Sequence, residues 1–405
     1  VRMNIDPMAE WRQIFGDMWR MEKEYFYDPN MHGLDWAGVR AKFEPLLAHV
    51  GRREDLNELM VEMAGEMGVG HNYIGGGDVY DNTDAAPGLL GADVRVENGR
   101  YRIKRIFTGE QWNPLLAAPL AAPGVDVKEG DYIIAVNGQE LTATDNIYAA
   151  LSGARGTQVA LTVAATPDGK RRTSVVEPIA NEGQLRLWAW IEDNRRRVDQ
   201  ATGGRVAYVY MPNTAGAGFT LFNRMYFAQT DRQALILDER ANGGGQAANY
   251  IIDVLSRKWL AGWQDRESTP YATPGGGIYG PKVMLIDQDA GSGGDWMPYA
   301  FRQTGLGTLI GTRTWGGLIG IRANPDLIEG GRLAVPNFRF FDTDGRFTIE
   351  NEGVVPDITV ELDPIAADRG QDTQLEAAIA TVLQQLEGAV SPVKTPPPYP
   401  TEIGK

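Results

Sequence analysis

The chain is short of the residue types that most often carry covalent or metal chemistry. Its 405 residues include no cysteine and only three histidines, His32, His49 and His71. The absence of cysteine excludes disulfides, thiolate nucleophiles and cysteine metal sites, and it leaves the redox compartment open. Any general base of the histidine type is therefore one of three residues.

Positive charge and long apolar runs are scarce as well. The chain has 39 Lys and Arg against 53 Asp and Glu, a net charge of -14, which gives no basic surface for nucleic acid. No apolar run approaches the roughly 18 residues that a membrane span requires, and nothing near the start is typical of a signal peptide. We predict a globular cytoplasmic protein that binds neither nucleic acid nor membrane, or a periplasmic one if a signal segment was removed. The abrupt start, "VRMNIDP", suggests part of a longer protein.

The first predicted domain, residues 1–86, has the apolar spacing of helices. Asp6 and Pro7 form an N-cap and first-turn pair before "MAEWRQIFGDMWRMEKEYF". Two further helical segments follow, and each ends near glycine. The unit finishes in "GVGHNYIGGGD", residues 68–78, where glycines end the helix and expose His71 on a loop.

The second predicted domain, residues 87–185, changes to short strands and turns. Its segments "PGLLGADV" (87–94) and "VKEGDYIIAVNGQEL" (127–141) resemble a PDZ domain. In such a domain the first segment supplies glycine-flanked backbone amides that hold a peptide carboxylate, and an extended peptide is bound by strand addition. The alternative is a small β barrel that serves only as a spacer.

The third predicted domain, residues 186–390, alternates strands and helices. The runs "RVAYVYMP", "QALILDER", "KVMLIDQ" and "GTLIGT" are typical of strands, and helical segments lie between them. This alternation predicts an α/β core with a largely parallel sheet. Residues 391–405 are rich in proline and are predicted to be extended. The fold class is therefore α+β and α/β multidomain: a helical unit, a PDZ-like β barrel and an α/β core.

Ser292 is the candidate nucleophile. The chain has six serines, and only Ser292, in "DQDAGSGGDW" (287–296), lies at a junction between a predicted strand and a predicted helix. There its side chain projects from the top of the sheet, and the amide of Gly293 points to the same place at a helix N-terminus. The glycine run in "DERANGGG" (238–245) offers further backbone amides that can approach a substrate carbonyl, although an ordinary turn explains that run as well.

His71 is the candidate base, because the other two histidines have structural explanations. His49 lies in the last turn of a predicted helix, where a cation suits the helix dipole, and His32 follows "DPNM" in a turn. A serine nucleophile generally needs a nearby base. We expect the acid limb of kcat/KM to follow His71, near pH 6.5 and higher if a carboxylate is close.

The order of these segments resembles one known family. "GHNYIGGGD", the PDZ-like unit, "DERANGGG", "DAGSGGDW", "GTRTWGG" and "IENEGVVPDI" are similar to the catalytic half of the tricorn protease family, relatives of the carboxyl-terminal-processing proteases. The resemblance implies a ClpP/crotonase-like protease core. It also implies Ser292 as nucleophile, His71 as base and Glu350 as the residue that completes the relay, with an oxyanion hole of amides from Gly293, Gly244 and Gly243.

Two positions depart from the family patterns. Carboxyl-terminal-processing proteases use a Ser-Lys dyad with lysine in a glycine-rich segment like "GTRTWGGLIG", whereas this chain has Trp315 and two glycines there. The tricorn pattern places a serine before the histidine to bridge it to the glutamate, whereas this chain has Gly70. We expect water, another side chain or a direct contact to replace that bridge, and Gly70→Ser to keep or raise activity unless Gly70 needs a positive φ.

These observations predict a serine endopeptidase or oligopeptidase that cleaves oligopeptides or unfolded polypeptides through an acyl-enzyme, without metal or cofactor. Asp265, in "AGWQDREST", is a candidate partner for a basic substrate side chain. The resemblance further implies a homo-oligomer and β-propeller domains upstream. The alternatives are a PDZ-bearing peptide-binding scaffold on an inactive protease fold and a crotonase-like acyl-CoA enzyme.

Overall fold

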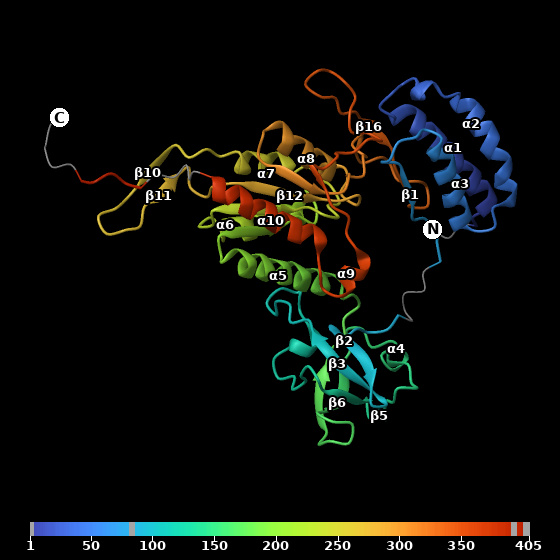
Figure 1. Ribbon diagram of the computed structural model, residues 1–405. Helices are drawn as coiled ribbons and strands as arrows, with labels where there is room; N and C mark the ends of the chain where they lie inside the picture. The colour runs from blue at the N-terminus through green and yellow to red at the C-terminus, as the bar shows by residue number, and fades with distance from the viewer. Residues whose placement is uncertain (1–3, 81–85, 390–394, 400–405) are drawn as a thin grey trace, which may run out of the picture. The chain divides into compact units, whose positions relative to one another are not determined.

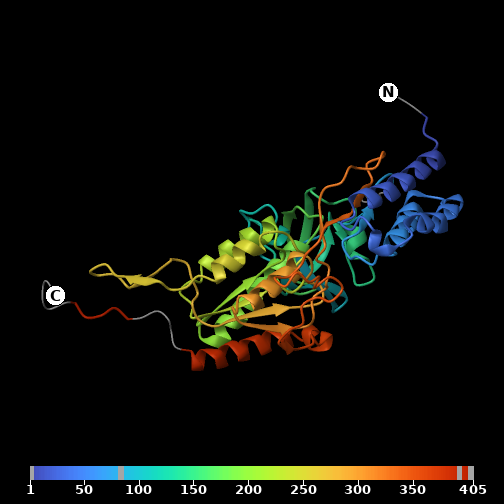
Figure 2. The same cartoon turned by 90° about the horizontal axis from the view of Figure 1, so that it is seen from above.

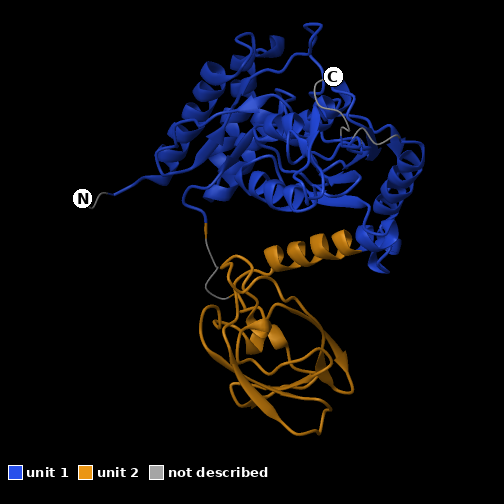
Figure 3. Ribbon diagram, turned by 90° about the vertical axis from the view of Figure 1, so that its left-hand side faces the viewer, with its two compact units in different colours: residues 1–79, 197–405 blue, residues 80–196 orange. Residues whose placement is uncertain are grey.

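The computed structural model describes residues 4–80, 86–389 and 395–399. Their contacts divide the chain into two compact units, which Figure 3 shows in two colours. The first unit joins residues 1–79 to residues 197–405, and the second comprises residues 80–196. The first predicted domain and most of the third therefore share one unit. The four-part division of the chain stays a prediction.

The first unit begins with a helical subdomain, as predicted. Asp6 caps the first helix, because its side chain accepts hydrogen bonds from the amides of Met8 (3.0 Å) and Ala9 (3.3 Å). The elements of the subdomain are α1 (Pro7–Tyr25), η1 (Met31–Gly33), α2 (Trp36–Phe43), η2 (Glu44–His49) and α3 (Arg53–Gly65).

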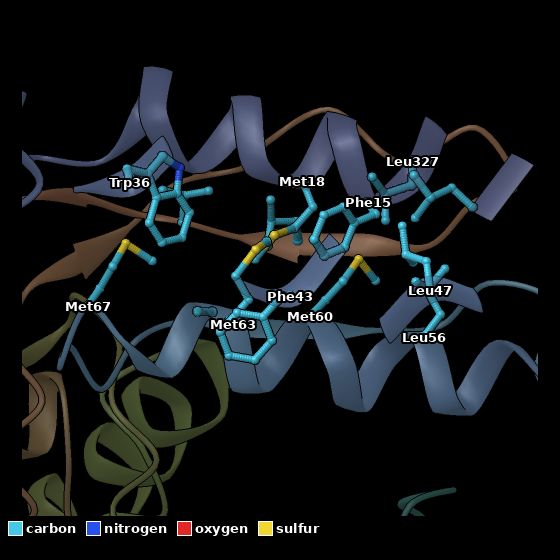
Figure 4. Packing of buried hydrophobic residues seen from close by; sticks show 14 of the residues in the cluster. Phe15, Met18, Trp36, Phe43, Leu47, Leu56, Met60, Met63, Met67 and Leu327 are labelled. Carbon is cyan, nitrogen blue, oxygen red and sulfur yellow. The ribbon is translucent and has the colours of Figure 1, made fainter. Parts of the chain in front are cut away.

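The core of the helical subdomain is completed from a distant part of the chain. Figure 4 shows Phe15 and Met18 of α1 pointing toward Met60 and Met63 of α3. Leu327, Leu333 and Val335 belong to the same buried cluster. The short strand β1 (Tyr73–Gly75) pairs antiparallel with β15 (Arg332–Ala334). The loop that carries His71 is therefore tied to residues near position 333.

The α/β core of the first unit is built on a parallel sheet, as predicted. Five described strands form it in the order β17-β13-β12-β9-β8, and every neighbouring pair is parallel. Helix α10 packs along β9, β12 and β13 (Figure 1), and Figure 2 shows it beside these strands. The sheet strands are β8 (Val206–Tyr210), β9 (Ala234–Asp238), β12 (Lys282–Ile286), β13 (Thr308–Gly311) and β17 (Ile358–Thr359).

The helices and small strand pairs of the core surround this sheet. A hairpin of β10 and β11 projects away from it in Figures 1 and 2. The helices are α6 (Gly216–Phe227), α7 (Ala248–Leu255), α8 (Gly293–Gln303), α9 (Pro364–Asp368) and α10 (Thr373–Gly388). The remaining strands are β10 (Ala261–Trp263), β11 (Tyr271–Thr273), β14 (Gly320–Ile321) and β16 (Pro336–Phe338). Residues 395–399 have neither helix nor strand, and the rest of the predicted tail lies outside the described residues.

The second unit is an antiparallel β structure. Its sheet has the order β2-β3-β4-β6-β7, with β5 paired to β4, around a core that includes Ile133 and Leu161. Helix α5 (Gly183–Thr202) begins in this unit and ends in the other. The remaining elements are β2 (Ala92–Glu97), β3 (Arg100–Ile106), η4 (Pro119–Ala121), β4 (Tyr132–Val136), β5 (Gln139–Glu140), α4 (Ile147–Ala150), β6 (Val159–Ala164) and β7 (Arg172–Val176).

Candidate active site

Ser292 lies at the junction between β12 and α8, where the sequence predicted a strand-to-helix turn. Its φ is 58° and its ψ is -116°, a backbone conformation that costs free energy for any residue with a side chain. Two hydrogen bonds from its amide hold the turn, one to Asp295 Oδ2 (2.9 Å) and one to the carbonyl of Gly317 (3.0 Å). The surrounding structure thus fixes a strained backbone at the predicted nucleophile.

Asp295 organises this turn, and sequence reasoning missed it. Its carboxylate is fully buried, and it accepts hydrogen bonds from the Thr314 hydroxyl (2.5 Å) and from the amides of Gly316 (2.8 Å) and Gly317 (3.0 Å). Burial raises the pKa of Asp295, and these hydrogen bonds act in the opposite direction. Its place three residues after Ser292, typical of a capping box, was the available sign.

The glycine run comes against Ser292, as its predicted role requires. Gly244 has φ +82°, and a Cβ added to it would lie 2.6 Å from Ser292 Cβ and 3.0 Å from Ser292 Oγ, so only glycine fits. The predicted oxyanion amides differ in availability. The amide of Gly243 donates to the Pro212 carbonyl (3.0 Å), and that of Gly244 donates to Asn242 Oδ1 (2.9 Å).

The amide of Gly293 is the predicted oxyanion donor that remains available. Gly293 is the first residue of α8, where a helix has no internal acceptor for its N–H. Within residues 4–80, 86–389 and 395–399, its amide and that of Gly245 make no hydrogen bond. The position of a Cβ on Gly293 is 2.8 Å from the Gly245 nitrogen. The roles of Gly243 and Gly244 stay predictions.

His71 is held in a mostly buried position beside aromatic rings. The residue is 4% exposed, and its ring centroid lies 5.2 Å from that of Trp315 and 6.0 Å from that of Tyr73. Its buried Nδ1 has no hydrogen-bond partner among the described residues. Burial lowers the pKa of His71 below its ordinary value, whereas the Glu350 carboxylate and the Ile319 backbone raise it. The expectation of a raised pKa was therefore wrong in its net direction, because desolvation outweighs Glu350.

Glu350 is fixed near His71 by backbone amides. Its Oε1 accepts a hydrogen bond from Gly70 (3.2 Å), and its Oε2 accepts from Leu318 (2.6 Å) and Ile319 (2.7 Å). In the described parts of the chain no hydrogen bond joins Glu350 to His71 directly. Its charge nevertheless raises the pKa of His71. Glu350 thus touches the histidine loop through the amide of Gly70 and acts on the ring electrostatically.

Ser292 and His71 line one pocket, although they come from the two separate segments of the chain that form the first unit. The pocket has a volume of about 630 Å³ and includes Gly243, Gly244 and Gly293 in its wall. A neighbouring pocket of about 330 Å³ also contains Ser292 and His71. The structure therefore brings the predicted nucleophile, base and glycine run together.

Asp265 is the predicted site residue that does not join them. It lies in the loop of the hairpin between β10 and β11, which projects from the core in Figures 1 and 2. It is exposed and is absent from the described lining of both pockets.

Comparison with known proteins now places this arrangement. The chain matches the tricorn protease C1 domain over residues 7–65, the tricorn protease PDZ domain over residues 88–181 and peptidase family S41 over residues 205–360. Tricorn protease homolog 1 of Streptomyces coelicolor is 37% identical over 405 residues, which are 99% of this chain and 37% of that relative. The chain belongs to the tricorn protease family.

Other members of the tricorn protease family agree with this assignment. The tricorn protease of Thermoplasma volcanium is 32% identical over 393 residues, covering 95% of this chain and 38% of its own length. A crystal structure of the tricorn protease superposes with a TM-score of 0.89 at 29% identity, over 95% of this chain and 37% of that one. The chain thus spans well under half the length of these tricorn relatives.

Trp315 explains the glycine before the histidine, a departure from the tricorn pattern. A Cβ added to Gly70 would lie 2.7 Å from Trp315 Cζ2 and 3.0 Å from Cη2. Gly70 is not among the residues with positive φ, so the obstacle is the indole ring rather than the backbone conformation. The expectation that Gly70→Ser keeps or raises activity stays a prediction, and the structure argues against it, because a side chain at Gly70 would displace a ring that contacts His71.

The PDZ-like unit uses its own carboxylate at the predicted peptide-carboxylate loop. The amide of Gly91 donates to Glu182 Oε1 at 2.7 Å, in a buried setting. The amides of Gly88 and Leu89 donate to the carbonyls of Leu151 and Ile179, each at 2.8 Å. Three of the amides in "PGLLGADV" thus have internal acceptors.

No helix in the described part of the chain is both long and apolar enough to cross a membrane.

Proposed function

We propose that the chain is a serine peptidase that hydrolyses peptide bonds through an acyl-enzyme on Ser292. The observation that carries this proposal is the shared pocket of Ser292 and His71, with the available amide of Gly293 at its wall. A nucleophile, a base and an oxyanion donor in one cleft are the parts that acyl transfer needs.

The chemistry follows from these positions. Ser292 Oγ attacks the carbonyl carbon of the scissile bond, and His71 takes the hydroxyl proton. The tetrahedral oxyanion accepts a hydrogen bond from Gly293, to which one amide of the glycine run adds a second. When the intermediate collapses, the amine leaves with the proton from His71. Water then attacks the acyl-enzyme, with His71 again as base, and frees Ser292.

Glu350 supports the imidazolium that forms during both steps. Because it raises the pKa of a histidine that burial would otherwise keep neutral, it lowers the free energy of the charged state when the proton arrives. Its three backbone donors fix the carboxylate, so the charge is in place before the reaction begins.

The pocket walls favour apolar substrate side chains. Trp296, Leu318, Ile321 and Phe338 line it, and none of its described lining residues is Asp, Glu, Lys or Arg. The competing preference, for a basic side chain held by Asp265, stays a prediction. A peptide panel with aromatic, aliphatic, acidic and basic residues before the cleaved bond separates the two, and Asp265→Asn lowers the basic preference alone if Asp265 contributes.

The family resemblance alone supports three broader proposals: a homo-oligomeric assembly, upstream β-propeller domains in a longer parent chain, and a cytoplasmic location. Light scattering of the purified chain measures the first. The sequence upstream of "VRMNIDP" decides the second, and fractionation of cells that express it decides the third.

The deciding experiment compares wild type with Ser292→Ala on the fluorogenic peptide panel. We expect cleavage by wild type only, and a serine-directed phosphonate bound to Ser292 in the mass spectrum. Cleavage that Ser292→Ala leaves undiminished, or an adduct elsewhere, refutes the proposal. A folded wild type that binds peptides without cleaving them would favour the scaffold alternative, for which the comparisons give no support.

A further inference from the structure

A buried carboxyl group that the proposed reaction does not use lies beneath the glycine run. Glu239 follows β9 directly and is fully buried. Its Oε2 accepts a hydrogen bond from Asn242 Nδ2 at 3.2 Å. Its Oε1 is buried and has no partner within the described residues. Burial of such a group costs free energy.

Asn242 connects Glu239 to the active-site backbone in three ways. Its Oδ1 accepts the amide proton of Gly244 (2.9 Å), and its own carbonyl accepts that of Gly291 (3.0 Å), the residue before Ser292. A Cβ added to Gly294 would meet the Asn242 carbonyl at 2.8 Å, so the first turn of α8 also rests on Asn242. Asn242 therefore contacts both backbone segments that flank Ser292 Oγ.

Only one orientation of the Asn242 side-chain amide satisfies its hydrogen-bond partners. If the amide were reversed, Nδ2 would face the N–H of Gly244, and two donors would oppose each other. The Glu239 carboxyl oxygen stabilises the observed orientation, because it accepts a hydrogen bond from Asn242 Nδ2. Gly244 in turn lies against Ser292, at a distance that only a residue without a Cβ can reach. The chain of contacts thus runs from Glu239 through Asn242 and Gly244 to the nucleophile.

We infer that Glu239 is a positioning residue, which fixes the side-chain amide of Asn242 and thereby holds the glycine run at the distance from Ser292 that oxyanion binding requires. This inference deepens the proposed peptidase function and rests on it. Glu239 touches no substrate.

The charge state of Glu239 fits this role. Burial raises its pKa well above the ordinary value, and the carboxylates of Asp295, Asp287 and Asp238 raise it further, whereas the hydrogen bond from Asn242 lowers it. The raised pKa favours the protonated, neutral form of the Glu239 carboxyl. A neutral carboxyl keeps a carbonyl oxygen for Asn242 Nδ2 without placing another negative charge near Asp295.

The test compares Glu239→Gln, which keeps the acceptor oxygen, with Glu239→Leu, which removes it. We expect Glu239→Gln to stay within about 3-fold of wild-type kcat with an unmoved pH profile. We expect Glu239→Leu to lose about 10- to 100-fold in kcat with KM within about 3-fold, somewhat less than direct removal of an oxyanion donor. Ile236→Val, a buried change on the strand that ends just before Glu239, is the matched control, and we expect it to leave kcat unchanged.

A double-mutant cycle shows whether Glu239 acts through Asn242. Asn242→Ala should match Glu239→Leu, and the double variant should be little worse than either, because both remove one connection. Fully additive losses overturn the inference, as does wild-type kcat in a folded Glu239→Leu. A loss in Glu239→Gln as large as in Glu239→Leu also overturns it. If Glu239→Leu fails to fold, Glu239→Met takes its place.

Amide hydrogen exchange gives a readout that does not need turnover. Exchange in the segment 239–247 should quicken about tenfold or more in Glu239→Leu and stay unchanged in Glu239→Gln. Equal protection in both variants overturns the inference even if wild type proves inactive. The peptidase proposal fails separately, when wild type itself cleaves no peptide.

Discussion

Two glycine-framed turns in this molecule offer backbone amides, and they differ in what each amide meets. In the PDZ-like unit, Gly91 donates to the buried carboxylate of Glu182, from the same chain. In the α/β core, the amide of Gly293 makes no hydrogen bond within the described residues and lies at the wall of an open pocket. A turn that satisfies its own amides is structural, whereas a turn that leaves one unsatisfied is prepared for a ligand.

The same contrast extends to the charges around each turn. Glu182 supplies the negative charge at Gly91, and Arg186 pairs with it at 2.7 Å. In the turn that contains Gly293, the carboxylate of Asp295 already accepts hydrogen bonds from Thr314, Gly316 and Gly317. The Asp295 carboxylate also accepts a hydrogen bond from the amide of Ser292, and not from that of Gly293. In the reaction that we propose, the oxyanion of the substrate is the acceptor for which the Gly293 amide is available.

The largest expected effect comes from removing the charge of Glu350, which raises the pKa of His71 in the pocket that also contains Gly293. Glu350→Gln should lower kcat by about 10² to 10⁴, because the imidazolium loses its stabilising charge. The Glu350 carboxylate raises the pKa of His71, so its removal lowers that pKa further and moves the acid limb of kcat/KM to lower pH. In wild type that limb should lie below pH 6.5. The measurement is a pH series of kcat/KM, and an unmoved limb with unaltered kcat would remove Glu350 from the mechanism.

A smaller loss is expected when a side chain enters beside His71. Gly70→Ser should lower kcat by about 10-fold or more, because its Cβ displaces the Trp315 ring from its place against His71. Gly70→Ser with Trp315→Ala removes the clash and should recover part of that activity. A single Gly70→Ser variant with wild-type kcat would show that Trp315 moves aside freely.

The turn at Gly91 in the PDZ-like unit is the closed turn, because Glu182 accepts its amide. Changes to Glu182 should alter the stability of the protein and not its catalysis. Glu182→Ala leaves the buried amide of Gly91 without an acceptor, at a cost of about 1 to 3 kcal/mol in the free energy of unfolding. Glu182→Gln keeps an acceptor oxygen and should cost less. Both variants should retain wild-type kcat, as measured by denaturant unfolding beside the peptide assay. A fall in kcat would break the comparison, since it would give the closed turn a catalytic role.

The closed turn also predicts how the PDZ-like unit treats free carboxyl ends. In a Ser292→Ala background, a peptide with a free C-terminus should bind no better than its amide, because Glu182 already occupies Gly91. The additional change Glu182→Ala should introduce a preference of a few-fold for the free acid. A preference already present in Ser292→Ala alone would show that Glu182 is readily displaced.

The last prediction concerns a buried carboxyl in the helical subdomain, and it affects stability and not catalysis. Burial raises the pKa of Glu22 to about 8. The folded state therefore binds a proton more tightly than the unfolded state, and stability falls as the pH rises from about 4.5 to about 8. Glu22→Gln should flatten this slope, which denaturant midpoints at several pH values measure. A slope as steep as that of wild type would assign the pH dependence to other groups.

The sequence was informative where a local pattern had a local cause. Apolar β-branched runs predicted the parallel strands, Asp6 before Pro7 predicted the start of α1, and the "GSGGD" turn predicted the place of Ser292. Residues whose role depends on distant neighbours were not predictable. The Trp315 ring lies where a side chain at Gly70 would be. The two residues are separated by 244 others in the sequence, and no sequence pattern indicates that they meet.

The other roles that were not predicted depend on burial. The sequence pattern does not indicate whether an individual polar residue is buried. His71 was expected to have a raised pKa from Glu350, but desolvation has the larger influence. Glu239 and Asn242 read as members of an ordinary glycine-rich turn, whereas both are fully buried beneath the nucleophile. Such roles follow from the packing of several segments around one point.

The pairing of β1 with β15 has a consequence for the time at which activity arises. The strand next to His71 finds its partner roughly 260 residues later, and Leu333 and Val335 complete the core of the helices before it. A ribosome makes the chain from its N-terminus, so we expect His71 to take its fixed place only after residue 335 has emerged. Closing so long a loop comes late in folding, because its entropy cost must be met before its contacts form. A nascent or truncated chain thus carries Ser292 without a positioned base, and the peptidase we propose arises only when synthesis of its catalytic core is nearly complete.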